Sequence, residues 1–547
     1  MEIINPIIPG MAPDPSIVRV EDTYYIATST FHWQPGIQLF SSKDLGNWKS
    51  IGFVLTNEQS NLRGTSTPAG IWAPHLSYDH QTQKFWIAYS HMVNMEGREF
   101  NAENYAVWSY NIKGPWSKPI YLTSIGFDPS IFHDDDGKKY ISILEWETRE
   151  GYQAPGTIVI AEIDLLEGIL KTDWHRVSKG FTTRGCVEAP QIYKRNGYYY
   201  LINASGGTGY AHGVEIGRSR DIFGPYEPHP TGEPILTSSP KHLFSLGDPD
   251  AGRFDMYNPS SEIQKSGHGS LVQTKEDDWY MVHLMSRPIK GTMINPLGRE
   301  TSIQKMKWTK DNWLEKYDSI NLASVKVEGP NNYIINNTNW DIDDNFDGLG
   351  STDFMTPYHL AKKDWTFITD SQKLRIYGKN SLFSKYEPAI LATRATSLKY
   401  EFETAIQFNP EHYSQTAGFG LYYDSNNWIY VHLTYSEEVK SKQLRILQAI
   451  KGKKIEYPNI RIEVGIEPVK LKLLYNNGLV TFKYSIESLA EQTLLENMDV
   501  KYLSDEGVNG VEGEIGGFSG MFNFIASVDA FQRLSYAEFD YYRVLNL

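Results

Sequence analysis

The chain is poor in the residues that would cross-link it covalently or anchor it in a membrane. Its 547 residues include one cysteine, Cys186, so no disulfide can form within the chain. No stretch approaches the roughly 18 consecutive apolar residues of a membrane-spanning helix. The first residues, Met1 to Pro6, lack the basic region and apolar run of a signal peptide. These absences predict a cytoplasmic protein that is held together by its hydrophobic core and does not bind a membrane.

Positive charge is also scarce in this chain. There are 52 Lys and Arg residues against 66 Asp and Glu residues, which gives a net charge of −14. An acidic surface is repelled by nucleic-acid phosphates and by anionic lipid headgroups, so neither is an expected partner. A neutral ligand is indifferent to this charge, which also favours solubility. The sequence leaves open whether the chain forms a homo-oligomer.

Helical periodicity is the third feature that the sequence lacks. No long stretch has the 3.6-residue hydrophobic period of an amphipathic helix. Short aromatic runs bounded by turn residues recur instead, such as Tyr24-Tyr25-Ile26 and Tyr198-Tyr199-Tyr200. Aromatic residues make up 13% of the chain, and such residues favour strands. We therefore predict an all-β protein.

An acid close to a proline marks the start of a repeated unit. Asp14 and Asp128 directly precede a proline, and Glu188 lies one position earlier in Glu188-Ala189-Pro190. Trp72-Ala73-Pro74 and Gly267-His268-Gly269 occupy the same place in two further units. The steps are 59, 55, 61 and 79 residues between Pro15, Pro74, Pro129, Pro190 and Gly269. Repeats of this size with several short strands are typical of propeller blades, so residues 1–325 are predicted to form a five-bladed β-propeller.

The repeat ends before the last 200 or so residues. A polar stretch from Glu328 to Asn345 carries no repeat, and we place the domain boundary at its start, so that the second domain covers residues 326–547. Strand-like segments continue there, for example Lys399–Thr404 and Gly418–Tyr423. Evenly spaced strands separated by Gly and Asn turns predict a β-sandwich.

The three acids suit the hydrolysis of a glycosidic bond. Inversion needs one carboxylate to activate water and one carboxylic acid to protonate the leaving oxygen, with the two about 6.5–9.5 Å apart. A third carboxylate near the acid raises the pKa of that acid by repulsion and keeps it protonated near neutral pH. Glu188 has the longest side chain of the three and is the best candidate for the proton donor. The residues alone separate the roles of Asp14 and Asp128 only weakly.

Other residues near the heads of the predicted blades are candidates for holding a sugar. Phe31, Trp33 and Trp72 are candidate platforms, although such residues are found as often in a core. Arg287 follows a predicted strand and can bond sugar hydroxyls or lie at the surface. His268 occupies the acid position of the fifth unit, where it can orient the carboxylates or bind a metal, although no second ligand motif lies nearby.

These motifs resemble those of glycoside hydrolase family 43, and within it the two-domain β-xylosidases. The resemblance covers most of the first domain and rests on Pro13-Asp14-Pro15-Ser16, Tyr24–Phe31, Gly70–Leu76, Phe127-Asp128-Pro129-Ser130, Glu188-Ala189-Pro190, Gly206–Tyr210, Gly267-His268-Gly269 and Leu297–Thr301. The second domain resembles, through weaker motifs, the concanavalin- or lectin-like β-sandwich that follows the propeller in these enzymes.

The resemblance implies an inverting enzyme that releases xylose from the non-reducing ends of β-1,4-xylooligosaccharides and needs no cofactor for its chemistry. It implies Asp14 as general base, Asp128 as pKa modulator and Glu188 as general acid. It also implies a pocket for one terminal sugar, closed by a loop of the second domain and lined by Phe31, Trp72, Thr208, His268, Arg287 and Phe518. The family often carries a calcium or other divalent ion near the histidine, which here is His268.

Two departures from the family pattern bear on substrate preference. Ala12 stands where relatives usually carry Asn, and His32-Trp33-Gln34 replaces the commoner Glu-Trp-Phe. An α-L-arabinofuranosidase on the same scaffold is the main alternative, because both activities occur in this family. A retaining fructosidase-like enzyme is a further alternative. A non-catalytic sugar-binding protein is disfavoured, because it has no need of three acids.

Overall fold

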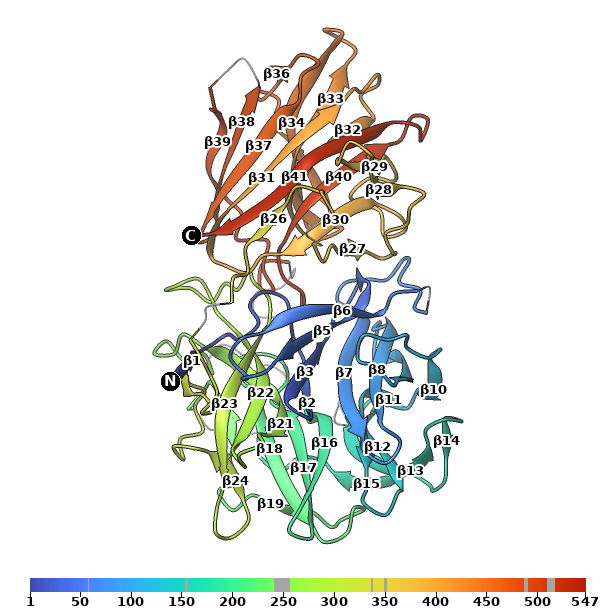
Figure 1. Ribbon diagram of the computed structural model, residues 1–547, viewed down its shortest axis with the longest axis vertical. Helices are drawn as coiled ribbons and strands as arrows, with labels where there is room; N and C mark the ends of the chain where they lie inside the picture. The colour runs from blue at the N-terminus through green and yellow to red at the C-terminus, as the bar shows by residue number, and fades with distance from the viewer. Residues whose placement is uncertain are drawn as a thin grey trace.

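The computed structural model describes residues 1–57, 59–152, 156–240, 256–335, 338–348, 352–486, 490–508 and 517–547. Every regular element among these residues is a β-strand. The strands form two bodies stacked end to end, with the N-terminus in one and the C-terminus in the other (Figure 1). None of the described residues belongs to a helix of the length and apolar character that crossing a membrane requires. The all-β prediction is confirmed.

Five antiparallel sheets make up the first body in the part of the chain that the structure describes. The first contains β2 (Ser16–Val20), β3 (Thr23–Thr28), β5 (Gly36–Ser42) and β6 (Lys49–Leu55). The second contains β7 (Gly70–Asp79), β8 (Lys84–Asn94), β9 (Asn101–Ser109) and β10 (Ile120–Thr123). The third contains β11 (Gly126–His133), β12 (Lys139–Trp146), β13 (Gly156–Asp164), β14 (Ile169–Leu170) and β15 (His175–Ser178). The fourth contains β16 (Glu188–Arg195), β17 (Tyr198–Ser205), β18 (Gly213–Ser219), β19 (Glu227–Pro228) and β20 (Leu236–Thr237). The fifth contains β21 (Gln264–Gln273), β22 (Trp279–Ser286), β23 (Glu300–Trp308) and β24 (Leu314–Lys316). This is the predicted five-bladed β-propeller.

The N-terminal segment joins the first blade to the fifth. Strand β1 (Glu2–Ile4) pairs with β25 (Lys326–Glu328), and the Asn5 side chain donates a hydrogen bond to the Ile303 carbonyl of β23 at 2.8 Å. The Ile7 and Ala12 amides donate to the carbonyls of Thr301 and Arg299. Chain ends that are far apart in sequence therefore close the ring, and Arg299 is brought beside the strand that carries Asp14.

One residue at or near the start of the inner strand of each blade has a left-handed backbone. The φ angles are +54° at Asp14, +43° at Ala73, +59° at Asp128, +51° at Ala189 and +52° at His268. These five residues are the ones that directly precede the aligned Pro15, Pro74, Pro129, Pro190 and Gly269. Side chains other than Gly avoid this conformation, and it persists where the surrounding structure enforces it. The repeat inferred from sequence is therefore a repeat of backbone geometry.

Two stacked sheets make up the second body. One contains β26 (Ile342–Asp344), β28 (Thr366–Ile368), β29 (Leu374–Tyr377), β31 (Lys399–Phe408), β37 (Val469–Asn476), β38 (Leu479–Ile486), β39 (Gln492–Asp499) and β41 (Tyr536–Asn546). The other contains β30 (Ala389–Arg394), β32 (Gln415–Asp424), β33 (Asn427–Ser436), β34 (Ser441–Ile450), β35 (Lys453–Glu456), β36 (Ile462–Glu463) and β40 (Phe522–Asp529). Alternate side chains of the facing strands, such as Phe402, Phe419 and Phe482, fill the space between the sheets. The predicted β-sandwich is confirmed.

The change of domain falls between β25 and β26. Strand β25 pairs with the N-terminal β1, whereas β26 pairs with the C-terminal β41. The three residues after the predicted boundary at 325 therefore still pair with the propeller.

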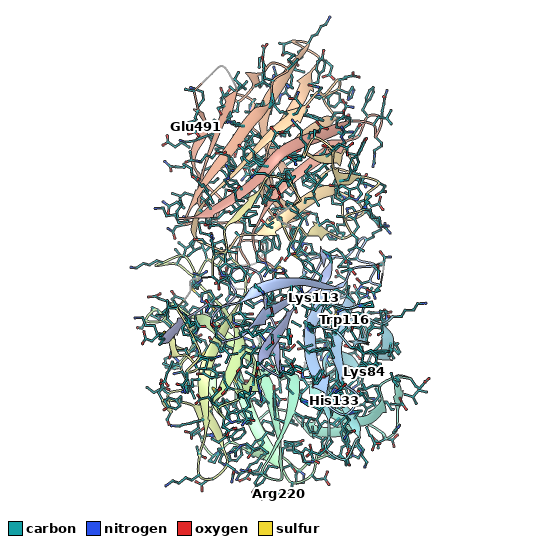
Figure 2. The ribbon with its side chains drawn as sticks, viewed as in Figure 1. Lys84, Lys113, Trp116, His133, Arg220 and Glu491 are labelled. Carbon is teal, nitrogen blue, oxygen red and sulfur yellow. The ribbon has the colours of Figure 1, made fainter. Side chains whose placement is uncertain are left out.

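The domains are joined by a two-stranded sheet and by close packing. Strand β4 (Trp33–Gln34) of the propeller pairs with β27 (Thr356–Pro357). The Trp33 side chain is fully buried, and its ring stacks on Phe522 of the sandwich with 3.8 Å between centroids. A Cβ atom on Gly298 would lie 1.8 Å from the Ser519 carbonyl oxygen, so the two backbones touch there. Side chains of both domains fill the junction (Figure 2), which makes it a continuous core.

We expect Trp33→Ala to weaken this junction by about 3–5 kcal/mol, because a buried Trp loses its packing and leaves a cavity. Calorimetry checks this through the unfolding midpoint. The control is Trp116→Ala, which removes a half-buried ring between β9 and β10 of the second blade, labelled in Figure 2. Equal shifts of the midpoint in both variants would contradict a junction that depends on Trp33.

Candidate active site

Asp14 lies two residues before β2 and is 7% exposed. Ser29 Oγ donates a hydrogen bond to its carboxylate at 2.6 Å, and the same Ser29 Oγ accepts one from the Ala73 amide of the second blade. The Asp14 Oδ1 atom lies 3.5 Å from His268 Nδ1 and 3.8 Å from Arg299 Nη1. Blades one, two and five therefore meet at this carboxylate, which faces one permanent cation.

Asp128 and Glu188 belong to the same cluster of charges. Asp128 is buried, and its carboxyl accepts a hydrogen bond from the Ala189 amide, the residue after Glu188. Burial raises the pKa of Asp128 well above its usual value, and the charges of Glu188 and Asp14 raise it further. Burial raises the pKa of Glu188 to about 7, with a smaller contribution from the charge of Asp14 and an opposing one from Arg299. Near neutral pH, Glu188 can therefore carry a proton.

Arg299 connects the three parts of the site. Its guanidinium donates to Thr208 Oγ1 at 2.6 Å and to the Phe518 carbonyl at 2.7 Å, besides facing Asp14. Its side chain is 4% exposed. Arg299 belongs to the motif Leu297–Thr301, but the sequence did not assign it a role in the site. Its position directly before β23, a strand of the fifth blade, is the feature that could have indicated such a role.

The aromatic residues predicted for the sugar pocket come together. The ring centroids of Phe31 and Trp72 are 6.0 Å apart, and Phe518 of the sandwich lies 6.5 Å from Phe31 and 6.4 Å from Trp72. The guanidinium of Arg299 lies 5.3 Å from the Phe31 ring and 4.9 Å from the Phe518 ring. Contact of these residues with a sugar stays a prediction, and their proximity supports it.

Two predicted sugar contacts have other surroundings. Trp33 is 0% exposed and is stacked on Phe522 between the domains, so its assignment as a sugar platform is wrong. Arg287 makes a bidentate ion pair with Glu300 at 2.7 and 2.8 Å and reaches the Thr396 carbonyl. The contact with Thr396 links the propeller to the sandwich, and the role of Arg287 toward a sugar stays a prediction.

His32, one of the departures from the family pattern, packs in the junction between the domains. It is 0% exposed and stacks on Tyr358 of the second domain. Its effect is therefore on the packing of the domain junction.

The described residues do not offer a protein-built metal site. No group of three or more His, Cys, Asp or Glu side chains among them is placed to hold an ion. The buried Nε2 of His212 has no hydrogen-bond partner, but a neutral imidazole is a poor ligand for calcium, which prefers six to eight oxygens. His268 is the one residue that the sequence predicted to bind a metal. Among the described residues, the carboxylate of Asp14 lies beside its ring.

Comparison with known proteins places this arrangement in a family. Residues 3–314 match the model of glycosyl hydrolases family 43, and residues 343–545 match that of the beta xylosidase C-terminal concanavalin A-like domain. The chain belongs to glycoside hydrolase family 43. This confirms the resemblance seen in the sequence, and members of this family hydrolyse glycosidic bonds without a cofactor for the chemistry.

The chain is similar over nearly its whole length to several characterised relatives. It is 35% identical to xylosidase/arabinosidase 43B of Humicola insolens, over 99% of this chain and 97% of that protein. It is 36% identical to a beta-xylosidase of Bacillus subtilis, over 95% of this chain and 96% of that protein. The crystal structure of xylan beta-1,4-xylosidase from Bacillus halodurans superposes with a TM-score of 0.91 at 36% identity and covers 100% of both chains.

We expect Arg299→Lys to lower kcat/KM on aryl glycosides by about a hundred-fold, because a single ammonium cannot reach three partners in the directions that a guanidinium does. Arg287→Lys is the matched comparison, and its expected loss is less than about three-fold, since Lys can still pair with Glu300. Steady-state kinetics checks both, with thermal midpoints to separate misfolding. A larger loss at Arg287 would instead make it the sugar-binding arginine.

Proposed function

We propose that this protein is an inverting exo-glycosidase that releases xylose from the non-reducing ends of β-1,4-xylooligosaccharides. The observation that carries the proposal is the set of three carboxyl groups from blades one, three and four, covered by an aromatic ring of the second domain. Family membership supports the reaction class, and a solved relative of the same architecture is named a xylan beta-1,4-xylosidase.

In the proposed mechanism, Asp14 is the general base and Glu188 is the general acid. Asp14 removes a proton from a water molecule as the water oxygen bonds to the anomeric carbon from the face opposite the leaving group. Glu188 gives its proton to the glycosidic oxygen as the carbon–oxygen bond breaks. The sugar leaves with inverted configuration, and the two carboxyl groups return to their starting states by exchanging protons with water. A pKa of about 7 suits Glu188 to this task.

Asp128 is proposed to modulate the acid and to orient it. Its carboxyl is held by the amide of Ala189, directly after Glu188, so the two acids are tied through one short piece of backbone. The mutual repulsion of Asp128 and Glu188 disfavours the state in which both are ionised. The pair therefore holds a proton at a pH where a lone carboxyl group would have lost it.

The exo assignment rests on the cover supplied by the sandwich. Phe518 lies against Phe31 and Trp72, and Arg299 holds its carbonyl. A site that is covered on one side admits the end of a chain, whereas an open groove admits its middle. Phe31, Trp72, Thr208, His268 and Phe518 are the proposed sugar contacts, to which the geometry adds Arg299; the role of Arg287 is decided by the kinetic comparison of Arg299→Lys with Arg287→Lys.

A second activity, on α-L-arabinofuranosides, is the alternative that a specific observation favours. One relative is named xylosidase/arabinosidase 43B, and another, 29% identical, is named a non-reducing end alpha-L-arabinofuranosidase. A Vibrio relative at 35% identity is named a xylan 1,3-beta-xylosidase, so the linkage also needs testing.

A calcium or other divalent ion near His268 stays a prediction from the resemblance. Since the described residues do not form a set of three or more ligands, no step of the mechanism is assigned to it. Such an ion would depend mainly on water for its coordination, with His268 beside it.

The test of the function is product analysis on five substrates in parallel. These are β-1,4- and β-1,3-xylobiose, xylohexaose, polymeric xylan and an arabinose-decorated xylooligosaccharide. We expect xylose as the first product from the β-1,4 oligomers, with the inverted anomer seen first by proton NMR. Long fragments released early from xylan would exclude exo action, and arabinose as the main product would establish the alternative.

A separate prediction concerns Glu188. In the unmodified protein, kcat/KM should fall as the pH rises through about 7, because Glu188 loses the proton that it must donate. Glu188→Gln should remove this alkaline limb and abolish turnover of xylobiose, while an activated aryl xyloside is affected less, since its leaving group needs little protonation. Equal losses on both substrates would assign the acid elsewhere.

A further inference from the structure

The segment that leads into Glu188 has no strand pairing of its own. Strand β15 ends at Ser178 and β16 begins at Glu188, so residues 179–187 form the irregular connection between the third blade and the fourth. Because this connection directly precedes Glu188, whatever holds it also helps to place the Glu188 backbone.

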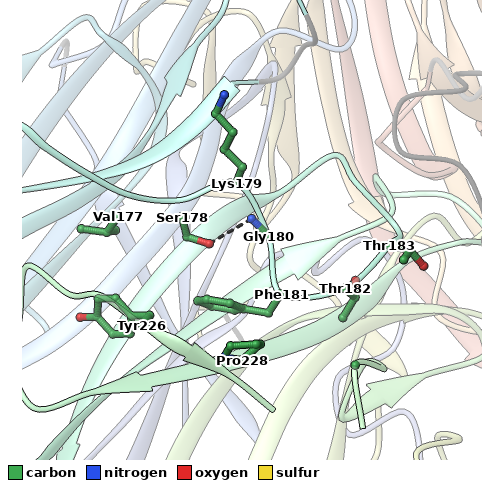
Figure 3. Close-up of a pocket in the computed structure, with 10 residues that line it drawn as sticks. Val177, Ser178, Lys179, Gly180, Phe181, Thr182, Thr183, Tyr226 and Pro228 are labelled. Atoms are coloured by element: carbon green, nitrogen blue, oxygen red, sulfur yellow. Dashed lines mark hydrogen bonds between the residues drawn. The ribbon is translucent and has the colours of Figure 1, made fainter. Parts of the chain in front are cut away.

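The outer side of this segment borders a surface pocket (Figure 3). The pocket has a volume of about 520 Å³ and is lined by Val177, Ser178, Lys179, Gly180, Phe181, Thr182, Thr183, Tyr226, Pro228 and Gly232. Lys179 and Thr183 are exposed. The Phe181 ring lies against Gly217, where an added Cβ atom would meet the ring at 2.4 Å. Packing from outside therefore restrains the segment mainly through this one ring.

The inner side of the segment is held by Glu215. The carboxylate of Glu215 accepts a hydrogen bond from the Phe181 amide at 3.0 Å and one from Thr182 Oγ1 at 2.9 Å. It also accepts one from Asn203 Nδ2 at 3.4 Å, and its side chain is 0% exposed. Both carboxylate oxygens are thus directed at the turn that begins the segment.

Glu215 is rigidly connected to Glu188 through the sheet of the fourth blade. Glu188 pairs with Ala204 of β17, and Ala204 pairs with Val214 of β18. Glu215 follows Val214 and pairs with Asn203 in the adjacent row. Glu215 and Glu188 therefore lie two strands apart in one sheet, and the segment 179–187 runs from the turn that Glu215 holds to Glu188.

A second anchor holds the later half of the segment. The Arg184 guanidinium donates to the Ala211 carbonyl at 2.6 Å and to Thr237 Oγ1 at 2.7 Å. Loss of the Glu215 contacts would therefore loosen the segment without releasing it completely. Glu188 should then be displaced slightly rather than removed from the site.

A buried carboxylate is a costly way to hold a turn, and the chemistry at Asp14 and Glu188 does not require it. Burial raises the pKa of Glu215, while its hydrogen bonds to Phe181, Thr182 and Asn203 act in the opposite direction. The charges that act on the pKa of Glu188 are those of Asp14, Arg299 and the neighbouring Asp128, and Glu215 is not among them. Any influence of Glu215 on Glu188 is therefore through position.

We propose that Glu215 is a positioning residue for the general acid, which it serves by fixing the turn at Phe181 and Thr182 through hydrogen bonds. The inference rests on the proposed role of Glu188 as proton donor. A displacement of the donor of about 1 Å is enough to cost a large part of its catalytic contribution. The loss should be confined to reactions that need protonation of the leaving group.

The experiment compares xylobiose with 2,4-dinitrophenyl β-xyloside, whose leaving group departs without a proton. Glu215→Ala should lower kcat/KM for xylobiose by about ten-fold or more and for the dinitrophenyl substrate by less than about three-fold. Glu215→Gln should stay close to the unmodified protein on both, because the amide oxygen still accepts from Phe181 and the Thr182 hydroxyl can rotate to accept.

Two further variants keep the test decisive if Glu215→Ala folds poorly. Thr182→Val removes one of the two hydrogen bonds between Glu215 and the turn with little change of side-chain shape. It should lower kcat/KM more for xylobiose than for the dinitrophenyl substrate, by a smaller factor than Glu215→Ala does. Asp79→Ala is the matched control, because Asp79 is also a buried carboxylate, bound by Thr82 and Lys139 at the far end of β7 from Trp72. It should change both substrates by the same factor.

Equal losses on both substrates in Glu215→Ala and Thr182→Val would overturn the proposal, as would a Glu215→Gln variant as impaired as Glu215→Ala. These outcomes differ from failure of the proposed function. If Glu188→Gln is itself unselective, the acid assignment falls and this inference falls with it. If Glu188→Gln is selective and the Glu215 and Thr182 variants are not, only the inference is refuted.

Discussion

Mutual repulsion among three carboxyl groups is the constraint on which the rest of the site depends. Asp14 and Asp128 are buried and Glu188 is half-buried, so ionisation of all three at once is unfavourable. Arg299 is the cation that faces Asp14 and also lowers the pKa of its two neighbours. One site therefore contains a carboxylate next to a cation and an acid that can keep its proton, as glycoside hydrolysis with inversion requires.

The propeller supplies this geometry by repeating one backbone irregularity. Each blade has a residue at positive φ at or near the start of its inner strand, and in blades one, three and five that residue is Asp14, Asp128 or His268. In blades two and four it is an alanine, and the residue of the candidate site is the one before it, Trp72 or Glu188. A strained conformation is tolerated because the neighbouring blades hold it, as the bonds of Ser29 to Asp14 and Ala73 illustrate.

The sandwich borders the site through the loop that contains Phe518 and Ser519. Ser519 meets Gly298 backbone to backbone, and this contact sets the residue before it, Phe518, against Arg299. The Tyr423 hydroxyl accepts a hydrogen bond from the Ser519 amide and donates to the buried Asp505, which fixes the loop from the other side. Arg299 thus contacts both Asp14 and the backbone of Phe518. Chemistry in the first domain is therefore coupled to the position of the second.

The sequence by itself determined the all-β class, the two domains, the five-fold repeat and the three acids. These features are local and periodic: a short motif returns at a similar spacing, and equivalent positions of a closed ring must converge. The tertiary structure decided what depends on distant segments. It assigned Arg299 to Asp14 and Arg287 to Glu300, and it buried Trp33 against a ring almost 500 residues away in the chain. It also revealed Glu215, because a lone glutamate in a strand gives no sign of the turn that will fold onto it. Such pairings depend on how the blades and the sandwich pack, and no spacing in the chain encodes that.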